Sequence, residues 1–189
     1  MLNEIIDFYI KSHPVTLFVL AVLALYFFAL NWVFFYRLFL LNAWISKESS
    51  SLESILMGLS HVSEKSYLSH FVKSSSKLSR EIFDLAHYAA TKESTKGLSF
   101  LSIVASTSPF IGLFGTVVSI LDTFSHIGQS SGTMTIIATG VSDALVATAS
   151  GIFVAIFAYT YHQILKRKAF DLSGLLKMQS DSILAKSTD

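Results

Sequence analysis

Three long apolar stretches constrain this 189-residue chain more than any other feature. They run from Val15 to Tyr36, from Gly97 to Leu121 and from Thr135 to Leu165, and Asp143 is the single charge in the third. A helix rises about 1.5 Å per residue, so about 20 apolar residues cross a bilayer. Only 14% of the residues are charged, whereas soluble domains average about 25%. The sequence therefore predicts an all-α integral membrane protein with three transmembrane helices.

These helices divide the chain into segments. We expect an N-terminal stub at 1–14, spans at 15–41, 98–125 and 135–165, a helical loop at 42–97, a turn at 126–134 and a tail at 166–189. The second and third helices are expected to extend into a helical bundle that the loop and tail form. That bundle is predicted because apolar residues recur at helical spacing. They are Leu52, Ile55, Leu56, Leu59, Val62, Leu78, Ile82, Leu85, Leu172, Leu176 and Ile183.

The distribution of Lys and Arg predicts the orientation. The loop at 42–97 carries seven and the tail carries five, whereas the turn at 126–134 carries none. Positively charged segments stay on the cytoplasmic side of a membrane. The loop and tail are therefore expected in the cytoplasm, and the N-terminus and the turn in the periplasm. The stub carries Glu4 and Asp7 rather than a basic start, so a cleaved secretory signal is not expected.

The three spans differ in side-chain size. The first is rich in bulky aromatic residues, which suits contact with lipid. The second and third carry small residues, several of them four positions apart, and this spacing lets helix backbones approach closely in a bilayer. The predicted packing residues are Gly112, Gly115, Gly140, Ala144, Ala147, Gly151 and Ala155. We expect a ring of copies, with the second and third helices inside and the first outside.

Three polar residues inside the spans are candidates for a functional site. Asp143 is the most informative, because a carboxylate in a bilayer is costly unless it faces a partner or water. We interpret it as part of a proton path, with an interfacial structural hydrogen bond as the alternative. Thr116 is expected level with Asp143, and Thr148 about one and a half turns deeper. Either hydroxyl alone is more typical of a bond to its own helix.

The sequence lacks the residues that several classes of function require. The chain has no cysteine, no phosphate-binding glycine loop, no metal-ligand cluster and no basic stripe for nucleic acid. An intramembrane aspartyl protease needs two facing carboxylates, and the usual motifs are absent around Asp122 and Asp143. We therefore expect neither an enzyme nor a bound cofactor or metal. A helical membrane scaffold that conducts no ions remains the alternative to an ion-driven machine.

Two stretches, Ser108–Val117 and Gly140–Gly151, resemble the second- and third-helix signatures of the ExbB/TolQ family, part of the MotA/TolQ/ExbB proton channel family. The resemblance covers roughly 98–168 and the three-span layout. It implies that Thr116 and Thr148 line a pore and face the membrane Asp of a single-span ExbD- or TolR-like partner. Asp143 stands where most members have Glu, and Thr139 where most have Pro.

The resemblance also implies a machine. It would be a homopentamer in the bacterial inner membrane, enclosing two partner helices and using the proton gradient to energise a TonB- or TolA-like protein. The N-terminal residues 2–8 look slightly more like TolQ than ExbB. The related flagellar stator subunit would need four spans rather than three.

Overall fold

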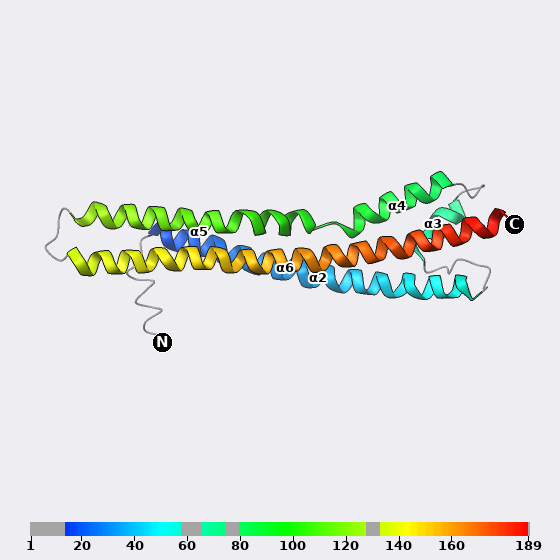
Figure 1. Cartoon of the computed structure of the whole chain (residues 1–189), viewed down its shortest axis with the longest axis horizontal. Helices are drawn as coiled ribbons and strands as arrows, with labels where there is room; N and C mark the ends of the chain where they lie inside the picture. Colours follow the sequence, from blue (N-terminus) through cyan, green and yellow to red (C-terminus); the bar gives the residue numbers. More distant parts are fainter. Residues whose placement is uncertain (1–13, 58–65, 75–79, 128–132, 189) are drawn as a thin grey trace. The chain divides into compact units, whose positions relative to one another are not determined.

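The computed structural model describes residues 14–57, 66–74, 80–127 and 133–188, and these ranges are helical without any strand. The helices are α2 (Pro14–Leu56), α3 (Tyr67–Ser74), α4 (Arg80–Ser94), α5 (Leu98–Ile127) and α6 (Thr133–Thr188) (Figure 1). Within the described ranges, α2, α5 and α6 are long and apolar enough to cross a membrane. The predicted all-α fold with three spanning helices is thereby confirmed. Most of the predicted stub and turn, and the side chains of Thr139 and Asp143, lie outside the described residues.

The chain divides into two compact units. The first, here called the membrane unit, combines the chain up to Trp32 with Phe100–Tyr161. The second, called the polar unit, combines Val33–Ser99 with His162–Asp189. Because α2 and α6 are long, each contributes one part to both units.

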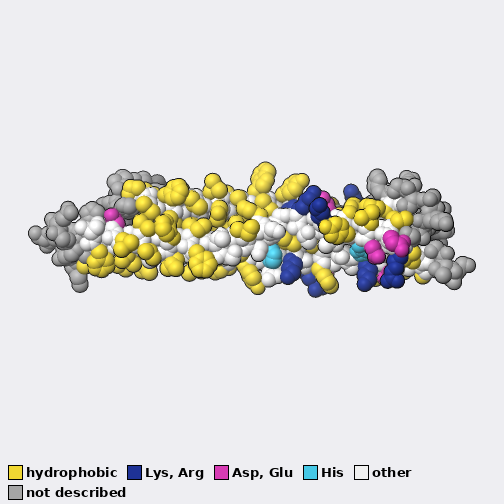
Figure 2. Space-filling view, turned by 90° about the horizontal axis from the view of Figure 1, so that it is seen from above, with side chains coloured by type: hydrophobic (Ala, Val, Ile, Leu, Met, Phe, Trp, Pro, Cys, Tyr) yellow, Lys and Arg dark blue, Asp and Glu magenta, His cyan; other side chains and the backbone are white. Residues whose placement is uncertain are grey.

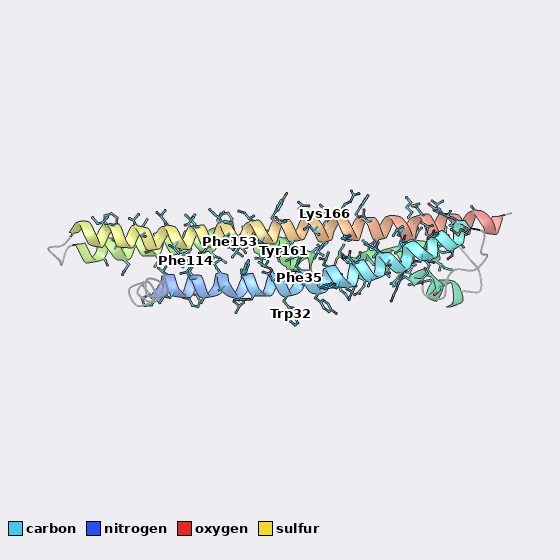
Figure 3. The ribbon with its side chains drawn as sticks, turned by 90° about the horizontal axis from the view of Figure 1, so that it is seen from below. Trp32, Phe35, Phe114, Phe153, Tyr161 and Lys166 are labelled. Carbon is cyan, nitrogen blue, oxygen red and sulfur yellow. The ribbon has the colours of Figure 1, made fainter. Side chains whose placement is uncertain are left out.

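In the membrane unit, α2, α5 and α6 lie side by side (Figure 1). Its core is apolar and tightly closed, with Leu23, Leu30 and Val154 almost fully buried. Its outer surface is also apolar: Phe28 is 73% exposed, and Trp32, 79% exposed, points away from the bundle (Figure 3). A surface of this kind is unfavourable in water over such an extent and suits lipid.

A tight corner joins α4 to α5 inside the polar unit. Gly97 adopts φ +85°, a conformation that favours glycine. The Arg37 guanidinium on α2 donates to the carbonyls of Glu93 (2.6 Å) and Ser94 (3.0 Å), so a cation neutralises the C-terminal end of α4. Lys96 pairs with Glu93 at 2.5 Å, and its hydrogen bond lowers the pKa of that carboxyl. The second span is therefore continued by α4 only after a turn, whereas α2 and α6 extend without a break.

A buried carboxylate holds three helices of the polar unit together. Glu48 on α2 is 1% exposed and accepts hydrogen bonds from Ser66 Oγ (2.9 Å) and from the backbone N–H of Tyr67 (2.8 Å), at the start of α3. Gln179 on α6 donates to its side chain (3.1 Å) and to its carbonyl (2.7 Å). Trp44 Nε1 adds a fourth donor to the carboxylate at 3.3 Å. Glu48 thus caps α3 and ties it to both long helices.

The buried face of α4 differs from the predicted one. Of Leu78, Ile82 and Leu85, which were expected to face the bundle, Leu85 is 61% exposed, Ile82 is half-buried, and Leu78 lies outside the described residues. The helix instead buries Phe83, Ala86, Ala90 and Ser94. The small alanines allow close approach while one phenylalanine fills the space, so the face with fewer large side chains packs better. In the tail, Leu172 and Leu176 are buried as predicted.

We expect the substitution Glu48→Gln to loosen α3. An amide offers two hydrogens where the carboxylate only accepts, so at least one buried donor loses its acceptor, at about 1–3 kcal/mol. Hydrogen exchange of the Tyr67 amide should accelerate in the variant. Glu53→Gln, on the exposed face of the same helix, is the matched control and should leave it unchanged. Equal exchange in both variants would contradict this role of Glu48.

Candidate functional site

The backbones of α5 and α6 meet at two glycines. A Cβ atom placed on Gly151 would lie 2.6 Å from the carbonyl oxygen of Ser108. One placed on Gly112 would lie 2.8 Å from the carbonyl oxygen of Ala147 and 3.1 Å from the Cα of Gly151. Both contacts are with backbone atoms, which cannot move aside. These positions therefore accept only glycine at the observed helix spacing.

The close contact continues along α5 and α6 on either side of these glycines. Gly115 faces Ala147 and also Val19 of α2, with a Cβ position 3.0 Å and 3.1 Å away, and Gly140 faces Thr123. Ala144 and Ala147 are fully buried, and Ala155 is half-buried. We call this contact line, from Ser108 to Thr123 on α5 and from Gly140 to Gly151 on α6, the glycine seam. The seam is closed within one chain, so it does not itself require the neighbouring copies that the sequence suggested.

Thr116 and Thr148 lie in the seam and contact each other. Their hydroxyl oxygens are hydrogen-bonded across the two helices. Thr116 Oγ1 also lies 3.2 Å from the carbonyl oxygen of Ala144, and both hydroxyls reach the carbonyl oxygen of Gly112, at 3.3 Å and 3.4 Å. The expected difference in depth between the two threonines is thus wrong. The ends of α5 and α6 cannot be fixed from the sequence to better than one or two residues, and a small shift at each end changes the relative level of residues on two antiparallel helices.

The threonine pair has more hydrogen-bond capacity than its neighbours use. Each hydroxyl has one hydrogen and two lone pairs. One threonine donates to the other, and the second hydrogen goes to a backbone carbonyl, so lone pairs remain on both oxygens. Both side chains are only half-buried. The pair can therefore accept a hydrogen bond from a polar group that approaches from outside the chain.

Two further hydroxyls continue the polar line toward the C-terminal end of α5. Ser119 Oγ donates to the carbonyl of Gly140 at 3.2 Å, and Thr123 Oγ1, in contact distance of Gly140, donates to the carbonyl of Ser119 at 2.8 Å. Both residues are buried. Sequence reasoning missed Thr123, although Thr116, Ser119 and Thr123 recur three and four residues apart on one face of α5.

The position of Asp143 is described only for its backbone, which is helical within α6, between Gly140 and Ala144. Its proposed place in a proton path stays a prediction. Among the residues whose side chains are described, no group of His, Asp or Glu is arranged to hold a metal ion.

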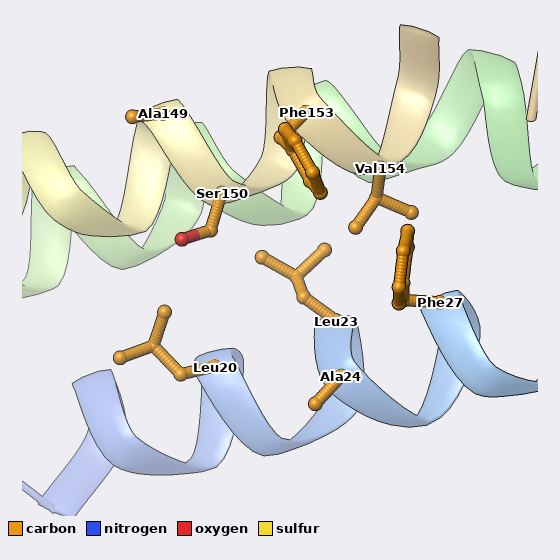
Figure 4. A pocket seen from close by; sticks show the side chains of 8 residues that line it. All are labelled: Leu20, Leu23, Ala24, Phe27, Ala149, Ser150, Phe153 and Val154. Atoms are coloured by element: carbon orange, nitrogen blue, oxygen red, sulfur yellow. The ribbon is translucent and has the colours of Figure 1, made fainter. Parts of the chain in front are cut away.

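An open groove on the membrane unit is a poor candidate for chemistry. It lies between α2 and α6, with a volume of about 470 Å³ (Figure 4). Its lining residues are Leu20, Leu23, Ala24, Phe27, Ala149, Ser150, Phe153 and Val154. Only Ser150 is polar, and its hydroxyl donates to the carbonyl of Val146 at 2.8 Å. The groove therefore offers mainly apolar contact, and the threonine pair is the candidate site.

Fold and site together define a class: an all-α membrane protein whose second and third spanning helices close on glycines and present paired hydroxyls. A model of the MotA/TolQ/ExbB proton channel family matches residues 54–178. The chain belongs to this family.

Relatives support the same assignment. The ExbB-like 1 biopolymer transport protein of Helicobacter pylori is 41% identical over 98% of this chain and 100% of its own length. The biopolymer transport protein ExbB of Neisseria gonorrhoeae is 48% identical over 38% of this chain and 33% of its own. The Tol-Pal system protein TolQ of Haemophilus influenzae is 50% identical over 30% of this chain and 25% of its own.

Replacing Gly151 by Ala should separate α5 from α6. The added methyl group meets a backbone carbonyl, and overpacking of this kind costs about 1–3 kcal/mol. We expect a lower melting temperature for the detergent-solubilised protein. Gly174→Ala is the matched control on the same helix, because nothing lies within 4 Å of a Cβ there and alanine is the better helix former. Equal melting temperatures for the two variants would show that the close contact does not contribute to stability.

Proposed function

We propose that this chain is the pore-forming subunit of a proton-driven inner-membrane motor, which encloses acidic single-span partner helices. The observation that carries the proposal is the threonine pair, held in a helix contact too close for any larger residue than glycine at its centre. Family membership supports a role in proton-driven transport. The partner is of the ExbD or TolR kind.

The chemistry of a hydroxyl suits a partner carboxyl group that changes its protonation state. A threonine hydroxyl can donate to a carboxylate and can accept from a carboxylic acid. The remaining lone pairs would accept a hydrogen bond from the partner's protonated acid. Once that proton has left, a hydroxyl hydrogen now donated to a backbone carbonyl would turn to the carboxylate instead, so the pair needs no charge of its own. Asp143 on α6 would add an acid of this chain to the path. No nucleotide-binding motif is present in the sequence, which fits an ion gradient as the energy source.

The assembly we propose is a homopentamer with α5 and α6 inside and α2 outside. The large exposed aromatic side chains of α2, such as Phe28 and Trp32, support its contact with lipid. The Lys and Arg distribution supports a periplasmic N-terminus and a cytoplasmic C-terminus. The relatives named ExbB-like align over the whole chain, whereas the TolQ relative aligns over 30% of it. The whole-chain alignment favours the ExbB branch over the TolQ branch suggested by residues 2–8, and the recipient of the work is a TonB- or TolA-like protein.

A scaffold that conducts no ions is the second candidate. The observation in its favour is that both threonine hydroxyls already have acceptors inside the chain, as in a structural tie between helices. The motor and the scaffold differ in one expectation. Removing one threonine hydroxyl without changing the fold should stop the motor but should leave the scaffold working.

Thr148→Val tests the proposal because valine keeps the shape and removes the hydroxyl. In cells that lack the native copy, we expect uptake driven by the proton gradient to fall at least about tenfold, which is about 1.4 kcal/mol in rate terms. Thr148→Ser should retain most of the activity. Thr160→Val is the matched control, because the exposed Thr160 hydroxyl only donates to the carbonyl of Ile156 in its own helix.

Proton flux into liposomes that contain the chain and its co-encoded partner should also fall in Thr148→Val and be largely retained in Thr148→Ser and Thr160→Val. Full uptake and flux in a normally assembled Thr148→Val complex would favour the scaffold and refute the motor.

A further inference from the structure

The outer face of α4 carries large apolar side chains in the polar unit. Leu85 is 61% exposed and Tyr88 is 70% exposed, one turn apart. Asp84, also exposed, precedes them. Figure 2 shows hydrophobic side chains standing among Lys, Arg, Asp and Glu on the face of this unit that it presents. Large apolar side chains that are exposed next to one another on a charged surface are candidates for a contact with another molecule.

The C-terminal part of α6 carries a second face of the same kind. Phe170 is 69% exposed and Met178 is 54% exposed. They lie eight residues apart, about two helical turns, and so on one side of the helix. Lys177 is exposed beside Met178. Arg167 is already engaged with Asp171 at 3.1 Å and with the ring of Phe170, which leaves Lys177 as the cation next to Met178.

The hydrogen bonds of the polar unit give the relative level of these two faces. Arg37 is bonded to Ser94 on α4, and Glu48 is bonded to Gln179 on α6. The eleven residues between Arg37 and Glu48 rise by about 16 Å, so the residue of α6 level with Arg37 and Ser94 is Lys168. The helices α4 and α6 run in opposite directions. Asp84, ten residues before Ser94, therefore lies at the same level as Met178, ten residues after Lys168.

That level pairs Asp84 and Leu85 of α4 with Lys177 and Met178 of α6. The acidic and apolar pair on α4 is thus at the same level as the basic and apolar pair on α6. Copies anchored in one membrane share their axis and their depth, so patches at equal height are the ones that can meet. The two patches are different surfaces of one chain, and a contact between different surfaces repeats around a closed ring.

We propose that the α4 face of one copy docks on the α6 face of the next, with Asp84 opposite Lys177 and Leu85 against Met178. The partner is a second copy of this chain. This inference rests on the ring in the proposed function and adds the surface through which neighbouring copies contact one another. The opposite charges fix the register, and the apolar side chains supply the contact area.

Cysteine cross-linking tests the contact directly, because the chain contains no cysteine of its own. Two differently tagged full-length copies are produced together, one with Leu85→Cys and the other with Met178→Cys. An oxidant added to membranes should join the two tags in one band. Because each cysteine is on a different chain, a disulfide within one chain cannot give this result. The double variant Leu85→Cys/Met178→Cys should give a ladder up to the full ring.

Control variants test the register and the symmetry of the α4–α6 contact. Leu85→Cys alone and Met178→Cys alone should give no covalent dimer, since each patch meets the other kind; a dimer from either would overturn the proposal. Thr91→Cys, about 9 Å further along α4 and about 120° around it from Leu85, should cross-link to Met178→Cys several-fold more slowly. Asp84→Lys should slow the 85–178 cross-link several-fold, and adding Lys177→Asp should restore it.

The subunit number of the unmodified protein, measured by native mass spectrometry, separates this inference from the proposed function. An oligomer that gives no 85–178 cross-link would refute the α4–α6 contact and leave the motor standing. A monomer in the membrane would refute both.

Discussion

The backbone contact between α5 and α6 is the constraint on which the candidate site depends. Gly112 and Gly151 bring a Cα of one helix against a carbonyl of the other, and no side chain fits between them. At this spacing the hydroxyls of Thr116 and Thr148 reach each other and the nearby carbonyls. A wider spacing would leave Thr116 with the Gly112 carbonyl of its own helix and would take Thr148 away from both of its α5 partners, Thr116 and Gly112. The small residues are therefore what turns two ordinary intramembrane threonines into a polar pair.

The two units stabilise the same long helices by different kinds of contact. In the membrane unit, contacts are apolar or rely on hydroxyls that satisfy backbone carbonyls, because unpaired polar groups are costly in lipid. In the polar unit, the buried carboxylate of Glu48 is stable because Ser66, Tyr67 and Gln179 donate hydrogen bonds to it.

Much of the fold follows from local sequence. Uncharged length indicates the spans, and the small residues at intervals of four indicate the seam, because both signals depend on one helix at a time. The partner of Glu48 could not be found in this way, since Gln179 lies 131 residues away and the pairing exists only in three dimensions. The buried face of α4 was misassigned for a related reason. Leu85 is the larger apolar residue, but the close packing of Ala86 and Ala90 decides which side turns inward. The contact of Thr116 with Thr148 needed the helix register, which residue counting does not supply.

The central claim is that the threonine pair faces an acidic helix of another protein inside a ring of copies. The most direct measurement is a cryo-electron microscopy structure of the chain purified with its co-encoded single-span partner in lipid. We predict a central cavity in which the partner's membrane carboxyl group lies within hydrogen-bonding distance of Thr116 or Thr148. Density for lipid tails against both threonines, with no enclosed partner helix, would contradict the claim.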